Sequence, residues 1–241
     1  MTSVTSHVRP SIFTRPAAPR RVYERAIVSV VLLCLAGWLL RAHPVDRGLA
    51  SALNSWHVGL VGALCEAVYV LFEPVPAIAL TVVITAVLWA VTRRWSVAAG
   101  FAGVVALTWI PSDVLKLVVQ RPRPEGSWLS HPFSPVQVDP SFPSGHMVFV
   151  TSLLLALLMV LRGSSWRRLV AAASVIVMVV VAFALCVDAV HWPTDVAASI
   201  LWAVAVAPAA RIIWVDIVIG QVVRRMEQTG RHRARDGEDT A

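Results

Sequence analysis

Charged residues are scarce in this sequence of 241 residues. Only 15% of the residues are charged, against about 25% in an average soluble domain, while 57% are hydrophobic and the mean hydropathy is +0.71. This composition excludes an ordinary soluble domain and indicates an integral membrane protein. The formal charge of +7 is not accompanied by basic patches interleaved with aromatic residues, so we expect no nucleic-acid partner.

Cysteine is also rare, and no secretory signal is visible. Cys34, Cys65 and Cys186 lie in apolar segments without CxxC or His/Cys metal spacing, so we assign no disulfide and no metal. Residues 1–24 lack the small-residue cleavage site of a signal peptide and are rich in proline and arginine. We therefore expect these residues to form a basic cytoplasmic tail.

What the sequence does contain is a series of long apolar stretches, which predict an all-α protein with six transmembrane helices. Pro111 predicts a kink in the third helix. Polar residues interrupt residues 42–73, which predicts interfacial helices there, and the six prolines of residues 120–144 predict a loop. The six predicted spans are 26–40, 74–92, 96–119, 146–161, 169–190 and 193–213.

The basic residues orient these helices. With six crossings, fifteen arginines fall at one end and only five basic residues at the other, and cytoplasmic ends carry the excess of positive charge. We predict a multi-pass protein of the cell membrane, in a bacterium the inner membrane, whose membrane domain (25–219) lies between cytoplasmic tails at 1–24 and 220–241. The loop at 120–144 and the junction of the last two spans then share the extracytoplasmic face.

On this predicted outer face, a loop runs into a helix at Pro143-Ser144-Gly145-His146. The N–H groups of a helix start attract oxyanions, and glycine lets a ligand approach the backbone. Ser144 is also a favoured helix cap. Taken alone, the motif leaves phosphate binding and simple capping open.

Basic residues precede this motif. Lys116 is the only lysine, and Arg121 and Arg123 alternate with prolines, which suits a rigid clamp for phosphate oxygens. The alternatives are a snorkelling lysine, a Lys116–Asp113 pair within one helix, and a basic loop that contacts lipid headgroups.

His191 and Asp195 lie four residues apart at the entry to the last span. A carboxylate in this position can accept the Nδ1–H of the histidine and leave Nε2 free to attack. The alternative is that Asp195 only caps the helix beside an interfacial histidine.

Together these residues resemble the type 2 phosphatidic acid phosphatase superfamily. Its three motifs are a lysine separated by six residues from Arg-Pro, a Pro-Ser-Gly-His, and a Ser-Arg separated by five residues from a His, which three further residues separate from an Asp. The matching residues are Lys116 with Arg123-Pro124, Pro143 to His146, and His191 with Asp195.

The third motif is degenerate, because Ala184-Leu185 replaces the Ser-Arg of the family. Loss of one preorganised donor costs about 3 to 4 kcal/mol, or 100- to 1000-fold in rate, so we expect a weakened site. Arg121 is a candidate to fill the gap. Asp188, one turn before His191, is a candidate to neutralise Arg121 or Arg123 or to select a different leaving group.

The resemblance implies a metal-independent phosphatase that needs no cofactor. It implies that His191 attacks phosphorus and becomes a phosphohistidine, that Asp195 stabilises the imidazolium, and that His146 protonates the leaving oxygen. The phosphate-binding residues that it implies are Lys116, Arg123, Ser144 and Gly145, with Arg121 as a further candidate.

A site at the outer membrane surface suits a lipid phosphate whose tail stays in the bilayer. Polyprenyl diphosphate, phosphatidate and phosphatidylglycerol phosphate all fit the family, with a weak preference for an isoprenoid carrier of the cell envelope. Because of Leu185, a catalytically weak or inactive lipid-phosphate binder or assembly partner remains an alternative. A transferase that uses an acceptor other than water is a third.

Overall fold

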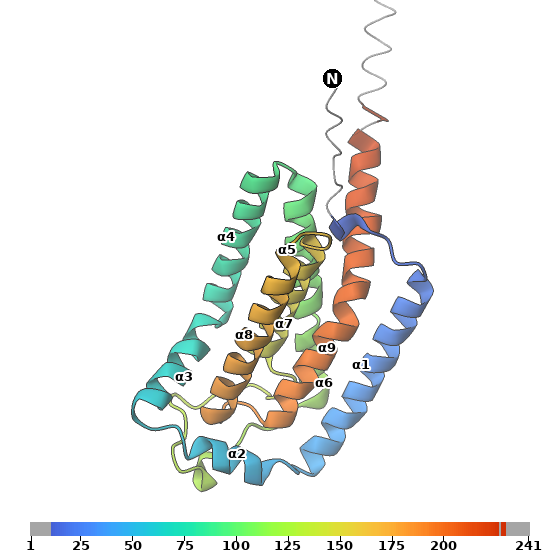
Figure 1. The fold of residues 1–241 in the computed structure, drawn as a ribbon. Coiled ribbons are helices and arrows are strands. Elements are labelled where there is room, and N and C mark those ends of the chain that lie inside the picture. Colours follow the sequence, from blue (N-terminus) through green and yellow to red (C-terminus); the bar gives the residue numbers. More distant parts are fainter. Residues whose placement is uncertain (1–10, 227, 230–241) are drawn as a thin grey trace, which may run out of the picture.

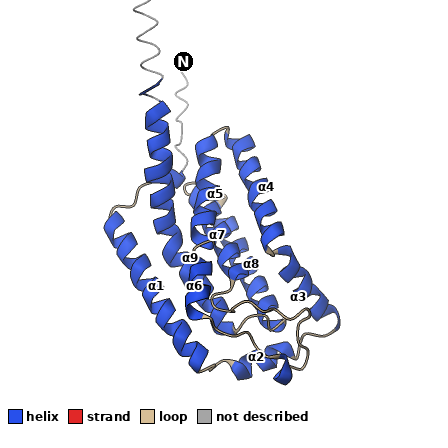
Figure 2. Ribbon diagram, turned by 180° about the vertical axis from the view of Figure 1, so that it is seen from behind, coloured by secondary structure: helices blue, strands red, loops and turns tan. Residues whose placement is uncertain are grey.

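The computed structural model describes residues 11–226, 228 and 229, and helices dominate this part of the chain (Figures 1 and 2). No strand occurs among the described residues, which confirms the predicted all-α membrane fold. Two short 3-10 turns, η1 (Ser11–Phe13) and η2 (Gly126–Trp128), lie outside the longer helices. The longer helices are α1 (Pro19–Ala42), α2 (Arg47–Asn54), α3 (Gly59–Leu71), α4 (Pro74–Thr92), α5 (Trp95–Trp109), α6 (Ser112–Val119), α7 (Gly145–Val160), α8 (Arg167–Val187) and α9 (Pro193–Arg211), which continues as the π-helix η3 (Ile212–Ile219).

Five helical segments of the described chain are long and apolar enough to cross a membrane. They are α1, α4, α5 together with α6, α8, and α9 with its continuation to Met226. The remaining predicted span is α7, whose 16 residues rise about 24 Å, less than the roughly 30 Å hydrocarbon core of a bilayer. The count of six crossings therefore stays a prediction.

Helix α7 lies at the centre of the bundle, where it packs against α5, α8 and α9. Four successive residues, Met147 to Val150, are buried, so α7 is covered on all sides. In contrast, α4 fully buries only Ala77, packs Leu80, Ile84 and Leu88 partly against the core, and exposes its other large apolar side chains. An outer helix that is apolar on its exposed face suits contact with lipid, whereas a short enclosed helix can hold a site rigidly.

Pro111 separates α5 from α6, as predicted. Helix α5 ends at Trp109 and α6 begins at Ser112, and both remain part of one 25-residue apolar segment. Proline lacks an N–H group and clashes with the preceding turn, which interrupts the helix. The break redirects α6 toward the loop at 120–144.

Gly103 allows the last helix to approach α5 closely. A Cβ at this position would lie 2.0 Å from Nε1 of Trp214, which donates a hydrogen bond of 2.7 Å to the carbonyl of Ala99. Any other residue at 103 would displace this tryptophan and the helix that carries it.

The N-terminal segment is more structured than predicted. Ile12 is fully buried, and its carbonyl accepts a 2.7 Å hydrogen bond from Nε of Arg211. Helix α1 already begins at Pro19. The part of the expected tail after residue 10 therefore packs against the bundle, because Ile12 and Phe13 give an otherwise polar segment an apolar anchor. The expected tail before residue 11 lies outside the described residues.

Residues 42–73 form two helices with different placements. In Figure 1, α2 lies across one end of the bundle, as an interfacial helix would, whereas α3 packs along α8. At the other end of the chain, the helix continues beyond Gly220, so the start of the predicted tail at 220–241 is helical; residues 230–241 lie outside the described part.

Candidate active site

The predicted site residues meet at the end of the bundle that α2 crosses. Lys116 comes from α6, Arg123 from the loop at 120–144, His146 from the first turn of α7 and His191 from the turn between α8 and α9. Because α7 contacts α6, α8 and α9, these segments converge around its N-terminus. The rings of His146 and His191 lie 6.4 Å apart, with a 63° angle between their planes.

Asp139 holds both cations of the first motif. Lys116 donates to one carboxylate oxygen of Asp139 at 2.6 Å, and Arg123 donates to the other at 2.8 Å and to the Asp139 carbonyl at 3.0 Å. Burial raises the pKa of Asp139, but the hydrogen bonds and charges of Lys116 and Arg123 outweigh it and lower the pKa overall. The carboxylate is therefore ionised, and its two oxygens bridge the cations as two phosphate oxygens can.

His191 is buried and held in one tautomer. Its Nδ1 lies 2.9 Å from the carbonyl of Ser141, and its Nε2 lies 3.4 Å from Nη1 of Arg123, which also donates to the carbonyl of Val190. A carbonyl can only accept and a guanidinium can only donate, so the proton belongs on Nδ1 and the lone pair on Nε2. Burial, together with the charges of Arg123 and Lys116, lowers the pKa of His191 well below its usual range. The ring is therefore neutral.

The predicted hydrogen bond between Asp195 and His191 is not formed. Asp195 Oδ2 lies 3.8 Å from Nδ1 of His191 and instead accepts the backbone N–H of Trp192 at 3.0 Å. The other oxygen accepts from Arg121 at 2.6 Å. Asp195 thus caps α9, and it remains close enough to His191 to act on its charge.

Arg121, a candidate phosphate ligand from the sequence, is held by protein partners in this structure. Its side chain is 1% exposed and donates to Asp195, to Thr194 Oγ1 at 2.7 Å and to Asp46 at 2.9 Å. Its guanidinium also stacks over Trp192 at 4.8 Å. A buried cation requires such counter-ions, so Arg121 ties the start of α2 to α9.

His146 presents a nitrogen that has no hydrogen-bond partner within the described part of the chain. Its ring stacks on Tyr69 of α3, with ring centres 4.4 Å apart, and its Nε2 is buried without a hydrogen bond among the described residues. Buried polar atoms are normally satisfied, and exceptions often mark functional groups. The stacked ring is therefore positioned to exchange a proton with a bound ligand.

Ser144 and Gly145 differ in their surroundings. Ser144 is buried; its Oγ accepts the N–H of Met147 at 3.4 Å, and its own N–H donates to Ser199 at 2.8 Å. Of the two roles that the sequence left open for Ser144, the structure shows the helix cap, and the N–H group predicted to bind phosphate is used by Ser199. Gly145 lines a cavity, and the nearest atom to a Cβ placed there is Nε1 of Trp109, 3.9 Å away.

This cavity has a volume of about 730 Å³. Its polar end is formed by Lys116, Arg123, Asp139, Gly145 and His146, and its apolar walls continue between α4 and α5. His191 is not on the cavity wall, since it is 1% exposed and Arg123 covers its Nε2. The site is therefore closed over its histidine while Asp139 holds Arg123.

Leu185 and Asp188 occupy the degenerate third motif. Leu185 is fully buried in the main apolar cluster, so this position supplies a hydrocarbon side chain in place of the arginine that the third motif predicts. Asp188 neutralises neither Arg121 nor Arg123; it lies 3.6 Å from Nε2 of His57, which also contacts Glu66.

Asp188 is fully buried, and neither carboxylate oxygen has a hydrogen bond among the described residues. Burial raises its pKa to about 7; the charge of His57 opposes this shift and that of Glu66 adds to it.

Sequence reasoning missed Asp46, Tyr69, Asp139 and Ser199. Asp139 is one of only two acidic residues in the loop at 120–144, and the need to balance the charges of Lys116 and Arg123 could have indicated it. Tyr69 carries no sequence signal, because its stacking on His146 depends on the packing of α3.

The helical bundle and its site define a membrane protein that can hold an anionic group beside a neutral histidine. Residues 95–218 match the PAP2 superfamily, and the chain belongs to this superfamily. No curated protein sequence matches the chain. The superfamily supports lipid phosphate phosphatase activity in general.

The fold is similar to the crystal structure of the first transmembrane PAP2 type phosphatidylglycerolphosphate phosphatase from Bacillus subtilis. The TM-score is 0.66 at 18% sequence identity, and the match covers 83% of this chain and 96% of that chain. This similarity confirms the fold.

Proposed function

We propose that this protein hydrolyses a lipid phosphate or diphosphate through a phosphohistidine intermediate. The observation that carries the proposal is the state of His191, whose Nδ1 is anchored on the Ser141 carbonyl and whose Nε2 lone pair faces Arg123. A neutral, oriented imidazole with a free lone pair is what attack on phosphorus requires.

When the substrate binds, its phosphate displaces the carboxylate of Asp139 from Lys116 and Arg123. The phosphate takes the place of the carboxylate between Lys116 and Arg123, which contact Asp139 at 2.6 and 2.8 Å. When Arg123 turns toward the phosphate, it uncovers Nε2 of His191. Both cations then lie where charge develops on the equatorial oxygens.

In the first chemical step, Nε2 of His191 forms a bond to phosphorus while the bond between phosphorus and the leaving oxygen breaks. His146 enters this step as an imidazolium and donates its Nε2 proton to the leaving oxygen, and this buried nitrogen has no hydrogen-bond partner among the described residues. Asp195, 3.8 Å from Nδ1 of His191, compensates the positive charge of the phosphorylated imidazole.

In the second step, water attacks phosphorus and gives a proton to His146. The phosphorus–nitrogen bond breaks, and its electron pair returns to Nε2 of His191. The products are the dephosphorylated lipid and inorganic phosphate. The protonation states of both histidines are restored, and every step uses side chains of this chain.

The apolar part of the cavity accommodates the lipid tail. It is walled by Ile78 and Val82 of α4 and by Ala102 and Val105 of α5, and a groove of about 460 Å³ continues it toward Trp89 and Trp95. These walls favour a substrate with a long hydrocarbon chain and do not select between a polyprenyl and an acyl chain.

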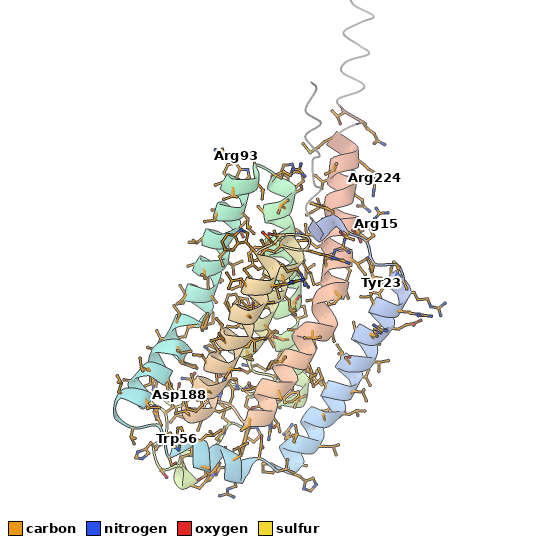
Figure 3. The ribbon with its side chains drawn as sticks, in the orientation of Figure 1. Arg15, Tyr23, Trp56, Arg93, Asp188 and Arg224 are labelled. Carbon is orange, nitrogen blue, oxygen red and sulfur yellow. The ribbon has the colours of Figure 1, made fainter. Side chains whose placement is uncertain are left out.

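We place this site on the extracytoplasmic side, with both chain ends in the cytoplasm. Figure 3 supports this orientation, because Arg93, Arg15 and Arg224 lie at the end of the bundle opposite to Asp188. The positive-inside rule assigns the arginine-rich end to the cytoplasm.

The test is phosphate release by the detergent-solubilised full chain from polyprenyl diphosphate, phosphatidate and glycerol phosphate. Wild type should hydrolyse a lipid substrate faster than glycerol phosphate, and His191→Ala should lose turnover and fail to form an acid-labile phosphoenzyme. The control is His131→Ala, an exposed histidine of the loop at 120–144. Equal phosphate release by wild type and His191→Ala would disprove the proposal.

The burial of Leu185 favours one alternative, a non-catalytic lipid-phosphate binder. In that case, wild type binds a lipid phosphate saturably but releases no phosphate from any of the substrates. Leu185→Arg, which restores the family's residue, then tests whether the missing arginine alone prevents turnover.

A further inference from the structure

A second cavity lies at the opposite end of the bundle from the candidate active site. Its volume is about 580 Å³, and it is bordered by the start of α5 and by the last helix. In Figure 3, Arg15 and Arg224 are labelled at this end, and Asp188 and Trp56 at the other. Helices α5 and α6 run between the two ends, since this cavity includes Arg94 whereas Lys116 lines the first.

Positive charge is in excess in this cavity. Arg15, Arg94 and Arg224 line it, and Asp216 is the only acidic residue among its described lining residues. Asp216 is already neutralised by Arg211, which donates to it at 3.2 and 2.9 Å, and Arg15 approaches it only at 4.0 Å. Across the described residues, neither Arg94 nor Arg224 forms an ion pair.

The start of α5 adds hydrogen-bond donors to this excess of charge. Helix α5 begins at Trp95 without a side-chain cap, and Ser96 of its first turn lines the cavity. Uncapped first-turn N–H groups and the helix dipole favour an anion. The side chain of Arg224 runs along its own helix toward Gly220, since its Nη1 is 3.5 Å from a Cβ placed at Gly220.

The other walls of the cavity are apolar. They include Phe13, Val215, Ile219 and Val223. Guanidinium groups above an apolar floor suit an amphiphile with a phosphate group, because the phosphate pairs with the arginines and the attached carbons cover the floor.

We propose that this cavity is a second anion site, which binds a phosphate ester through Arg94, Arg224 and the start of α5. The phosphate belongs either to an anionic phospholipid headgroup or to a soluble phosphate ester. The site does not depend on the proposed phosphatase activity, because it shares no residue with the catalytic cavity.

The experiment uses the full chain in detergent, and native mass spectrometry counts the bound ligands. The probes are phosphatidylglycerol, phosphatidylcholine and glycerol phosphate. All proteins carry His191→Ala, so that no probe is consumed. The pocket variant is Arg94→Gln with Arg224→Gln. The matched control is Arg93→Gln with Arg225→Gln, which removes the same charge from the neighbouring positions, neither of which lines the cavity.

We expect phosphatidylglycerol to bind more tightly than phosphatidylcholine, and its Kd to rise about tenfold or more in the pocket variant. The control variant should keep the original Kd within about twofold. Competition by glycerol phosphate identifies a site for the phosphate group itself, whereas lack of competition identifies a site for the intact lipid; both outcomes support the proposal. Equal affinities in the two variants, or equal binding of both lipids, overturn it.

A second variant covers the case in which the double variant fails to fold. Gly220→Leu places a side chain beside Nη1 of Arg224 without changing the charge of the protein. It should weaken phosphatidylglycerol binding while the midpoint of thermal unfolding without lipid stays close to that of wild type. Undiminished binding in Gly220→Leu and in Arg94→Gln alone also overturns the proposal.

Discussion

Arg121 and Arg123 are separated by a single proline, yet they serve two different regions of the molecule. Arg121 is 1% exposed and pairs with Asp46 and Asp195, two carboxylates held by helix starts. Arg123 lines the 730 Å³ cavity and pairs with Asp139, a carboxylate on a loop whose side chain is 48% exposed.

The two arginines differ in whether a phosphate can replace their carboxylate partners. Removing Arg121 from its partners would leave two buried carboxylates without a cation, so its contacts are permanent. Asp139 can move into water, and a phosphate can then take its place at Arg123 without leaving a buried charge unpaired. In the proposed reaction, Arg121 therefore supports the site, and Arg123 binds the phosphate.

The largest expected effect is that of Arg121→Met on stability. Loss of one partner of a buried ion pair costs about 3 to 5 kcal/mol, because Asp46 and Asp195 are then left buried without a cation. The measurement is the free energy of unfolding in detergent.

Arg47→Met is the control for Arg121→Met. Arg47 stacks on Trp128 at the same 4.8 Å as Arg121 on Trp192, but no carboxylate pairs with it in the described chain. The control should lose less than about 1 kcal/mol. If Arg121→Met loses activity at unchanged stability, Arg121 contacts substrate and the comparison with Arg123 fails.

Arg123→Gln should show the opposite pattern. We expect kcat/KM to fall about 100- to 1000-fold, because a preorganised donor to the transferring phosphate is lost. Its free energy of unfolding should change less than that of Arg121→Met, since Asp139 can be hydrated once its partner is gone.

A lysine at each position sharpens the result. Arg123→Lys keeps the charge and should retain part of the activity, whereas Arg121→Lys cannot reach Asp46, Thr194 and Asp195 together. Full activity in Arg123→Gln would contradict its assignment as a phosphate ligand.

The sequence predicted the helices well because their signals are local. Apolar runs and prolines placed α4 at Pro74–Thr92 and the break at Pro111, and the structure has both. The motifs also indicated the residues that meet at the site, namely Lys116, Arg123, His146 and His191.

Partners that depend on tertiary packing could not be predicted. His191 and Asp195 have the spacing for a hydrogen bond, but the Ser141 carbonyl, fifty residues away in the sequence, lies closer to Nδ1. The sequence around Arg121 suits a phosphate ligand, but Asp46, just before α2, pairs with this arginine in the fold. Charge balance in a buried region is a property of the whole fold.

Asp188 also tests the need for charge balance in a buried region, because no arginine pairs with this buried carboxylate in the described chain. Its pKa of about 7 lies above the reference value of 3.8, so between these values the folded state binds more protons than the unfolded state. Stability should therefore fall as the pH rises from about 4 to 7 and stay low above that. Asp188→Asn should remove this fall and gain roughly 2 to 4 kcal/mol at pH 8 relative to wild type.

Unfolding free energies at pH 5 and pH 8 check this prediction. Glu66→Gln is the control, because the side chain of Glu66 is 50% exposed and contacts the same histidine, His57. A wild-type stability that does not fall between these pH values would show that Asp188 has a partner when ionised.

The smallest expected effect is that of Asp139→Asn. This variant tests whether a phosphate can replace the carboxylate partner of Arg123, which distinguishes Arg123 from Arg121. In the proposed reaction, Asp139 competes with the substrate phosphate for Lys116 and Arg123, and a half-exposed ion pair contributes about 1 kcal/mol or less. The neutral amide should therefore lower KM about three- to fivefold and leave kcat within about twofold, because the cations stay in place.

Glu125→Gln removes the same charge from the same loop at an exposed residue that contacts neither cation, and should leave KM unchanged. A higher KM in Asp139→Asn would mean that Asp139 orients Lys116 and Arg123 for the phosphate instead of competing with it, and Arg123 would then share the supporting role of Arg121.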